Sequence, residues 1–120
     1  MKLIVIIALL ILSGSFNLYS QEKKEVIQTR IEFISEQLEA ESVDLTDVIA
    51  QLSYYYDRPL NLNSANVEEL QSLNLLTDIQ INDLMLHRKL FGKLISIYEL
   101  QSLTYWDMET IMNVLPFVKV

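Results

Sequence analysis

The chain has 120 residues, enough for one small domain with an appended segment. It contains no Cys, which excludes a disulfide framework, a thiolate metal site and a bacterial lipoprotein anchor. Sixteen acidic and nine basic residues give a formal net charge of −7, whereas a nucleic-acid module normally shows a basic face. Because Gly and Pro are scarce and apolar residues recur at helical spacing, the sequence predicts an all-α fold.

Residues 1–20 have the pattern of a secretory signal peptide. Lys2 supplies a positive charge, an unbroken apolar run follows at residues 3–12, and the next three residues are small and polar. A helix of that run would be about 15 Å long, roughly half the thickness of a hydrocarbon core of ~30 Å. We therefore expect cleavage, after Ser20, in preference to an uncleaved anchor. Either outcome places the rest of the chain outside the cytoplasm.

Residues 21–58 are predicted to form two helices. The first, at residues 22–41, has an apolar stripe at Val26/Ile27, Ile31, Ile34 and Leu38. The second, at residues 44–56, would be capped by Asp44 or Thr46. The pair Arg58-Pro59 would stop it from continuing, because the residue before Pro59 avoids the α conformation. We favour a supporting role for this pair, packed onto the segment that follows, over a docking surface.

The segment from residue 59 to residue 120 contains an internal repeat. The sequence Glu-Leu-Gln-Ser-Leu occurs at residues 69–73 and again at residues 99–103. Each copy is predicted to be a helix, a short turn and a helix, and two such units are expected to share one core. The apolar positions that coincide are Leu70/Leu100, Leu73/Leu103, Leu76/Trp106, Ile81/Ile111 and Leu84/Val114.

Start signals recur at matching places in the two copies. The predicted capping pairs are Asn66 with Glu69, Thr77 with Gln80 and Ser96 with Glu99, and Asp107 caps the last helix. Between the helices, the turns at residues 74–77 and 104–107 carry the large apolar residues Leu76 and Trp106. We expect both to fill the gap between paired helices, although an exposed Trp106 could instead stack on a base or anchor in a partner.

Residues 61–118 resemble the tandem helix-hairpin-helix domains of bacterial competence DNA receptors. The segment Asn61-Leu62-Asn63-Ser64-Ala65 matches the Asn-Leu-Asn-Ser/Thr-Ala opening of that family. Arg88, Gly92, Ser96 and Pro116-Phe117 also stand at corresponding places. The match has no gap and covers about half of the chain. It implies that the N-terminal helical pair is followed by a tandem helix-hairpin-helix domain at residues 59–120.

The chain departs from that family at the hairpins. The family has Gly-hydrophobic-Gly there, and the glycines let the backbone approach a DNA phosphate. The residues that stand at the two hairpins instead are Leu75, Leu76 and Thr77, and Tyr105, Trp106 and Asp107. A Cβ obstructs the approach, and the carboxylate of Asp107 would occupy the helix amides and repel a phosphate.

Arg88, Lys89 and Lys93 are the only basic cluster of the repeat. They could flank the hairpin as a weak phosphate clamp, but we favour a solvated helix C-terminus, where cations suit the helix dipole. His87 is the only His, and we expect it to be partly exposed and structural. No residue set suits catalysis, a metal or a cofactor.

The sequence therefore predicts an exported, non-catalytic interaction or structural module in the periplasm or at the outer membrane, acting on a protein partner. The alternative is a weak, sequence-independent DNA-binding protein of the competence type. The resemblance favours DNA binding, whereas the lost glycines and the acidic balance favour a protein partner.

Overall fold

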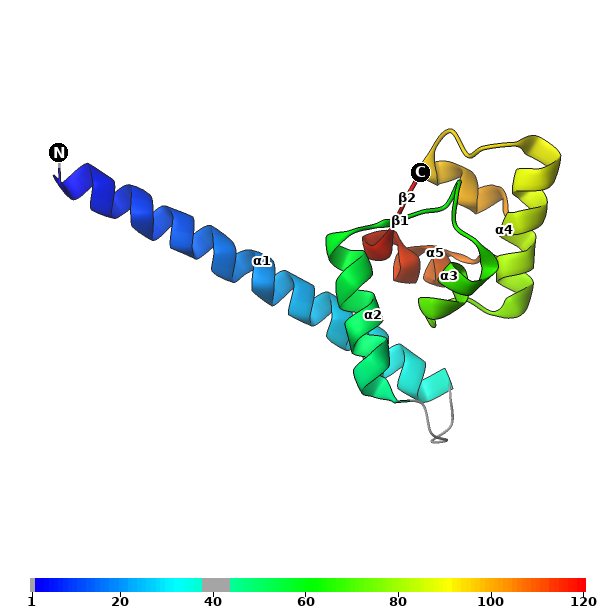
Figure 1. The fold of residues 1–120 in the computed structure, drawn as a ribbon, viewed down its shortest axis with the longest axis horizontal. Helices are drawn as coiled ribbons and strands as arrows, with labels where there is room; N and C mark the ends of the chain where they lie inside the picture. The colour runs from blue at the N-terminus through cyan, green and yellow to red at the C-terminus, as the bar shows by residue number, and fades with distance from the viewer. Residues whose placement is uncertain (1, 38–43) are drawn as a thin grey trace.

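The computed structural model describes the backbone of residues 2–37 and 44–120; within the first helix, side chains are described at residue 2 and from residue 18 onward. This part of the chain is mostly helical, as predicted (Figure 1). The elements in chain order are α1 (Lys2–Gln37), α2 (Leu45–Asp57), β1 (Leu60–Asn61), α3 (Val67–Ser72), α4 (Asp78–Phe91), the 3-10 helix η1 (Ile97–Ser102), α5 (Met108–Val114), the 3-10 helix η2 (Leu115–Phe117) and β2 (Val118–Lys119). Among helices formed by the described residues, none has the length and apolar character that spanning a bilayer requires.

Helix α1 passes without a break through the predicted cleavage point at Ser20. Its N-terminal half extends away from the rest of the molecule, whereas its C-terminal half lies against α2 (Figure 1). Asp57, the last residue of α2, accepts hydrogen bonds from Lys23 Nζ at 2.7 Å and Tyr19 Oη at 3.2 Å. The bond from Lys23 is the main reason why the pKa of Asp57 lies below its ordinary value. Leu38 of the predicted stripe lies outside the described residues.

The C-terminal half of α1 also packs on the repeat segment. Ile27 and Ile34, from the predicted stripe, are buried in the same apolar cluster as the residues of the two repeat copies. Arg30 donates from Nε to Asn113 O at 3.1 Å and from Nη2 to Met112 O at 2.9 Å. These two carbonyls belong to α5, so the guanidinium fixes α1 against the second repeat copy.

Helix α2 begins and ends as its sequence predicts. Asp44 is the N-cap, and its side chain accepts a hydrogen bond from Thr46 N at 2.9 Å. Arg58 closes the helix immediately before Pro59, where continuation in the α conformation is disfavoured. The three consecutive tyrosines near its end differ in burial, because neighbouring residues of a helix face different directions. Tyr54 is exposed, Tyr55 is buried and Tyr56 is half-buried.

The repeat copies contribute matching residues to the core. Four of the five aligned apolar pairs are buried in both copies, namely Leu70/Leu100, Leu73/Leu103, Ile81/Ile111 and Leu84/Val114. The fifth pair differs, because Trp106 is buried while Leu76 is only half-buried. In the first turn Leu75 fills the interior instead, with 5% of its surface exposed. The expectation for Leu76 is therefore correct only in part, because Leu76 packs against the core but Leu75 takes the buried position of the turn.

The backbone at Asn74 gives the reason. Asn74 has φ of 58°, and it is the one described residue other than Gly with positive φ. Asn tolerates this left-handed conformation because its short polar side chain bonds locally, and here Asn74 Nδ2 donates to Ser72 O. The resulting turn brings Leu75, rather than Leu76, to the interior.

The helix starts of the repeat were predicted correctly at three of four places. Reciprocal capping boxes are present at Asn66 with Glu69 and at Thr77 with Gln80, and Asp107 caps α5. The fourth prediction was wrong in part. The side chain of Ser96 does cap the helix start, because it accepts a hydrogen bond from Tyr98 N. Glu99 Oε1, however, accepts from Ile95 N and not from Ser96 N, so the reciprocal bond of a capping box is not formed. The helix that follows is a 3-10 helix.

A short parallel strand pair was not predicted from the sequence. Leu60 pairs with Val118 and Asn61 with Lys119, and Leu62 N donates to Lys119 O at 2.8 Å. The pair joins the two ends of the repeat segment. Two residues per strand are too few for an alternating pattern to be detected, so the all-α prediction missed it.

Candidate functional site

The first hairpin uses its helix-start amides internally. Thr77 Oγ1 accepts from Gln80 N at 3.3 Å, and Gln80 Oε1 accepts from Thr77 N at 2.9 Å. These amides head α4, where an anion would bind if the position were open. Because the capping box satisfies the amides of Thr77 and Gln80, these two donors of the first hairpin are not free for an anion.

The second hairpin is closed by two carboxylates. Asp107 Oδ1 accepts from Thr110 N at 2.8 Å and from Thr110 Oγ1 at 2.7 Å. Earlier in the turn, Tyr105 N donates to Asp83 Oδ2 at 2.8 Å. The expectation that Asp107 occupies the helix amides is confirmed for one of them, the amide of Thr110. Asp83 adds a second negative charge at the turn, which local sequence reasoning did not identify.

Trp106 anchors this hairpin in the core. Only 4% of its surface is exposed, and its Nε1 donates to Gln80 O at 2.9 Å. The expectation of burial is therefore confirmed, and the indole is not available for stacking on a base or inserting into a partner. Its neighbour Tyr105 is exposed at the tip of the turn.

Gln80 connects the two hairpins. Besides its capping role in the first, its Nε2 donates to Tyr105 O at 3.1 Å and to Thr110 Oγ1 at 2.9 Å in the second. One side chain thus holds the start of α4, the second turn and the start of α5 in fixed relation. The capping pattern identified Gln80, but only the tertiary structure shows this second role.

A groove of about 440 Å³ runs beside the two helix starts. One wall comes from the end of α1 and the others from the first hairpin and the start of α5. Its lining includes Phe33, Leu75, Leu76, Thr77, Asp107 and Glu109. Four of the six predicted hairpin residues therefore lie along one concavity, whereas Tyr105 and Trp106 do not line it.

The basic cluster lies at the opposite end of α4 from the first hairpin. Eleven residues separate Thr77 from Arg88, about 16 Å along a helix. Arg88 is half-buried and donates from Nη1 to Ala65 O at 2.6 Å, so it is committed to the fold. Lys89 and Lys93 are exposed and form no ion pair with another described residue. The cluster and the first hairpin do not form one site.

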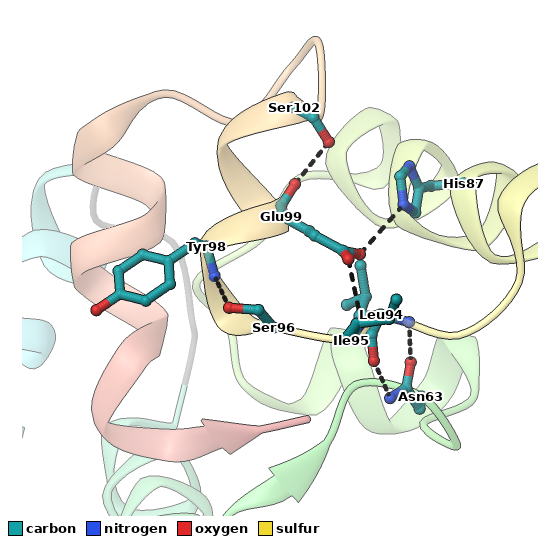
Figure 2. Close-up of polar contacts among 8 residues, drawn as sticks. All are labelled: Asn63, His87, Leu94, Ile95, Ser96, Tyr98, Glu99 and Ser102. Carbon is teal, nitrogen blue, oxygen red and sulfur yellow. Dashed lines mark hydrogen bonds and ion pairs between the residues drawn. The ribbon is translucent and has the colours of Figure 1, made fainter.

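Arg88, Lys89 and Lys93 line a separate recess of about 380 Å³ together with Asn63, Met85 and Gly92. Asn63 also fixes the chain that follows α4. Its Nδ2 donates to Leu94 O at 3.0 Å and its Oδ1 accepts from Leu94 N at 2.7 Å (Figure 2). This two-point clamp links the opening segment of the repeat to the connector between its copies.

His87 lies on the other side of this connector. Its Nε2 is 3.9 Å from Glu99 Oε2, and its ring packs 5.0 Å from that of Phe91 (Figure 2 shows the contact with Glu99). About 16% of the side chain is exposed, so the expectation that His87 is partly exposed is confirmed. Among the described side chains, no group of three His, Cys, Asp or Glu residues is placed to hold a metal ion.

The hydrogen bonds at Asp107 lower the pKa of its carboxyl, with the side chain of Thr110 as the first cause and the amide of Thr110 as the second. We expect NMR titration of Asp107 to give a pKa below the ordinary value of 3.8. A depressed carboxyl pKa contributes stability that is fully present above the unfolded-state value and is lost as the pH falls through the folded-state value.

The variant Thr110→Val, which removes the hydroxyl bond, should move the Asp107 pKa back toward 3.8. An unshifted Asp107 pKa in the wild-type protein would mean that the carboxylate does not cap α5 in solution.

Comparison with known proteins adds no family assignment. No protein-family model matches the sequence, and neither a curated protein nor a solved structure matches it.

Proposed function

We propose that the chain is an exported, non-catalytic interaction module with a tandem helix-hairpin-helix domain, acting on a protein partner in the periplasm or at the outer membrane. The duplicated helix pairs, their matching buried positions and the caps at their starts support this architecture. The apolar run after Lys2 supports export.

The observation that carries this proposal is the occupation of the hairpin amides. In a DNA-binding hairpin these donors must be open to phosphate oxygens. Here a capping box occupies the amides of Thr77 and Gln80, while Asp107 occupies the amide of Thr110 and Asp83 that of Tyr105. To reach these donors, a phosphate would have to displace the capping bonds of the first hairpin or the charge-assisted bonds of two carboxylates at the second, so the hairpins favour a protein over DNA.

The groove beside the hairpins is a suitable place for such a partner. It combines the apolar side chains of Phe33, Leu75 and Leu76 with carboxylates at Asp107 and Glu109. An apolar floor with a charged rim is the usual composition of a protein interface. The rim favours a partner segment that carries Lys or Arg.

Weak DNA binding is the second candidate, and it is supported by Lys89 and Lys93. Both lysines are exposed beside an open recess and form no ion pair with another described residue. Lysines at such positions can contact phosphates in any sequence.

Fluorescence anisotropy with a short labelled duplex tests the two candidates. We expect no binding by the wild-type chain at low or moderate salt. The matched variant is Lys89→Ala/Lys93→Ala, which leaves the structural Arg88 in place. DNA binding would instead appear as affinity that falls with salt, with a salt slope that is smaller in the variant by roughly 0.9 for each phosphate left without its lysine. That result would overturn the proposal.

A further inference from the structure

Three of the four most exposed large apolar residues of the repeat segment lie around the end of α4. Ile95 is 90% exposed, Phe91 is 75% exposed and Leu90 is 64% exposed. We call these three residues the apolar tip. A single exposed apolar side chain is ordinary, but several large ones within six residues mark a surface that contacts something else.

The apolar tip is held in place rather than presented by a loose loop. Gly92 ends α4 with φ of 82°, a conformation that favours glycine. Asn63 then fixes both backbone groups of Leu94, whose side chain is buried, and Glu99 Oε1 accepts from Ile95 N at 3.2 Å (Figure 2). Ile95 is therefore held outward by bonds at its own amide and at the residue before it.

Lysines alternate in the sequence with the residues of the apolar tip. Lys89 and Lys93 are exposed within the same stretch, and no Asp or Glu occurs from Arg88 to Ser96 although the chain has sixteen. The recess lined by Arg88, Lys89 and Lys93 lies beside it. The combination is a small apolar projection bordered by cations on an otherwise acidic protein.

We propose that the apolar tip and its flanking lysines dock the protein on an anionic phospholipid surface. Apolar side chains enter the boundary between headgroups and acyl chains, while Lys side chains keep their charge at the headgroup phosphates. Anionic lipids attract such lysines. A DNA duplex would accommodate the lysines but would offer no apolar environment to Phe91 and Ile95, so the lipid surface fits the whole set better.

This docking goes beyond the proposed function and does not depend on it. The groove that suits a protein partner is lined by the start of α4 and not by its end. A protein bound to a membrane through the apolar tip could still bind a partner at the groove. Failure of either interaction can therefore be measured separately.

The chain has no Cys, so a single introduced Cys can carry an environment-sensitive dye in the full-length protein. Two matched variants are Ile95→Cys at the apolar tip and Ile79→Cys, an exposed residue in the first turn of α4. The probes are vesicles of phosphatidylcholine alone and vesicles of phosphatidylcholine with phosphatidylglycerol. Dye emission and its quenching by aqueous iodide report whether each position enters the lipid.

We expect the dye at position 95 to shift to the blue and to resist quenching only with phosphatidylglycerol vesicles, while the dye at position 79 stays exposed to iodide. Adding Lys89→Ala/Lys93→Ala to Ile95→Cys should weaken the affinity for these vesicles about 30-fold, or about fivefold per lysine. The matched pair also controls for attachment through the apolar N-terminal run, which would not distinguish position 95 from position 79.

Three results with the vesicles would overturn the proposal. Position 95 could stay open to the quencher with both vesicle types, or both positions could respond equally, or the response could be independent of anionic lipid. A dye at position 95 that responds to duplex DNA and not to vesicles would also contradict it and would assign the surface to nucleic acid.

Discussion

Replacing Trp106 with Ala is expected to lower the free energy of unfolding by about 3–5 kcal/mol, the usual cost of truncating a buried large aromatic residue. Only 4% of the surface of Trp106 is exposed. The indole also donates from Nε1 to Gln80 O, so Ala both leaves a cavity and removes this hydrogen bond. The loss should be measured by urea unfolding with far-ultraviolet circular dichroism.

The variant Trp106→Phe separates the two contributions. Phe keeps most of the buried apolar volume but cannot donate to Gln80 O, so it should cost less than Ala. If Trp106→Ala changed the unfolding free energy by less than about 1 kcal/mol, within the range of many surface substitutions, the second hairpin would not be anchored as described. Exposed Tyr105 gives the neighbouring control, because Tyr105→Phe should be nearly neutral.

Replacing Ile34 with Ala is expected to cost about 2–5 kcal/mol, because the side chain is almost fully buried and the site cannot close completely. The effect should reach the whole described domain, since Ile34 belongs to the same apolar cluster as the two repeat copies. Circular dichroism follows all the helices, and the fluorescence of Trp106, the only Trp, follows the second hairpin.

Both signals should shift to lower urea concentration together in Ile34→Ala. The exposed Glu36 supplies the control on the same helix, and Glu36→Ala should stay within about 0.5 kcal/mol of the wild-type protein. Loss of helical signal before any change in Trp106 fluorescence would contradict a shared core. It would show that α1 unfolds independently of the repeat segment.

The features that the sequence predicted are those with a local physical cause. Helix starts at Asn66, Thr77 and Asp107 could be predicted because a cap needs only residues within one turn of each other. The buried partners of the two copies could be predicted because duplication repeats the same apolar positions. The helical outline of the fold could therefore be derived from spacing alone.

What the sequence could not predict depends on contacts between distant residues. Asp83 lies 22 residues from the amide of Tyr105 that it occupies, and Gln80 lies 25 residues from the carbonyl of Tyr105. No periodic pattern links such positions. The misplaced interior residue at the first turn has a different cause, since the left-handed backbone of Asn74 decides which leucine turns inward.

The clamp at Asn63 was also beyond local reasoning. Its two bonds to Leu94 span 31 residues, and they decide that Leu94 is buried while Ile95 is exposed. The sequence placed the opening segment only through a family resemblance. In the structure, it fixes the surface for which we propose lipid docking.

The strand pair between β1 and β2 has a mechanical consequence. Its two strands run in the same direction, and the chain enters at the start of one and leaves at the end of the other. Tension between α2 and the C-terminal residue would therefore pull the strands along their length in opposite senses. Their hydrogen bonds would be loaded in shear, all at the same time, instead of opening one after another. The strand pair would therefore give the repeat segment mechanical resistance to being pulled apart at its ends.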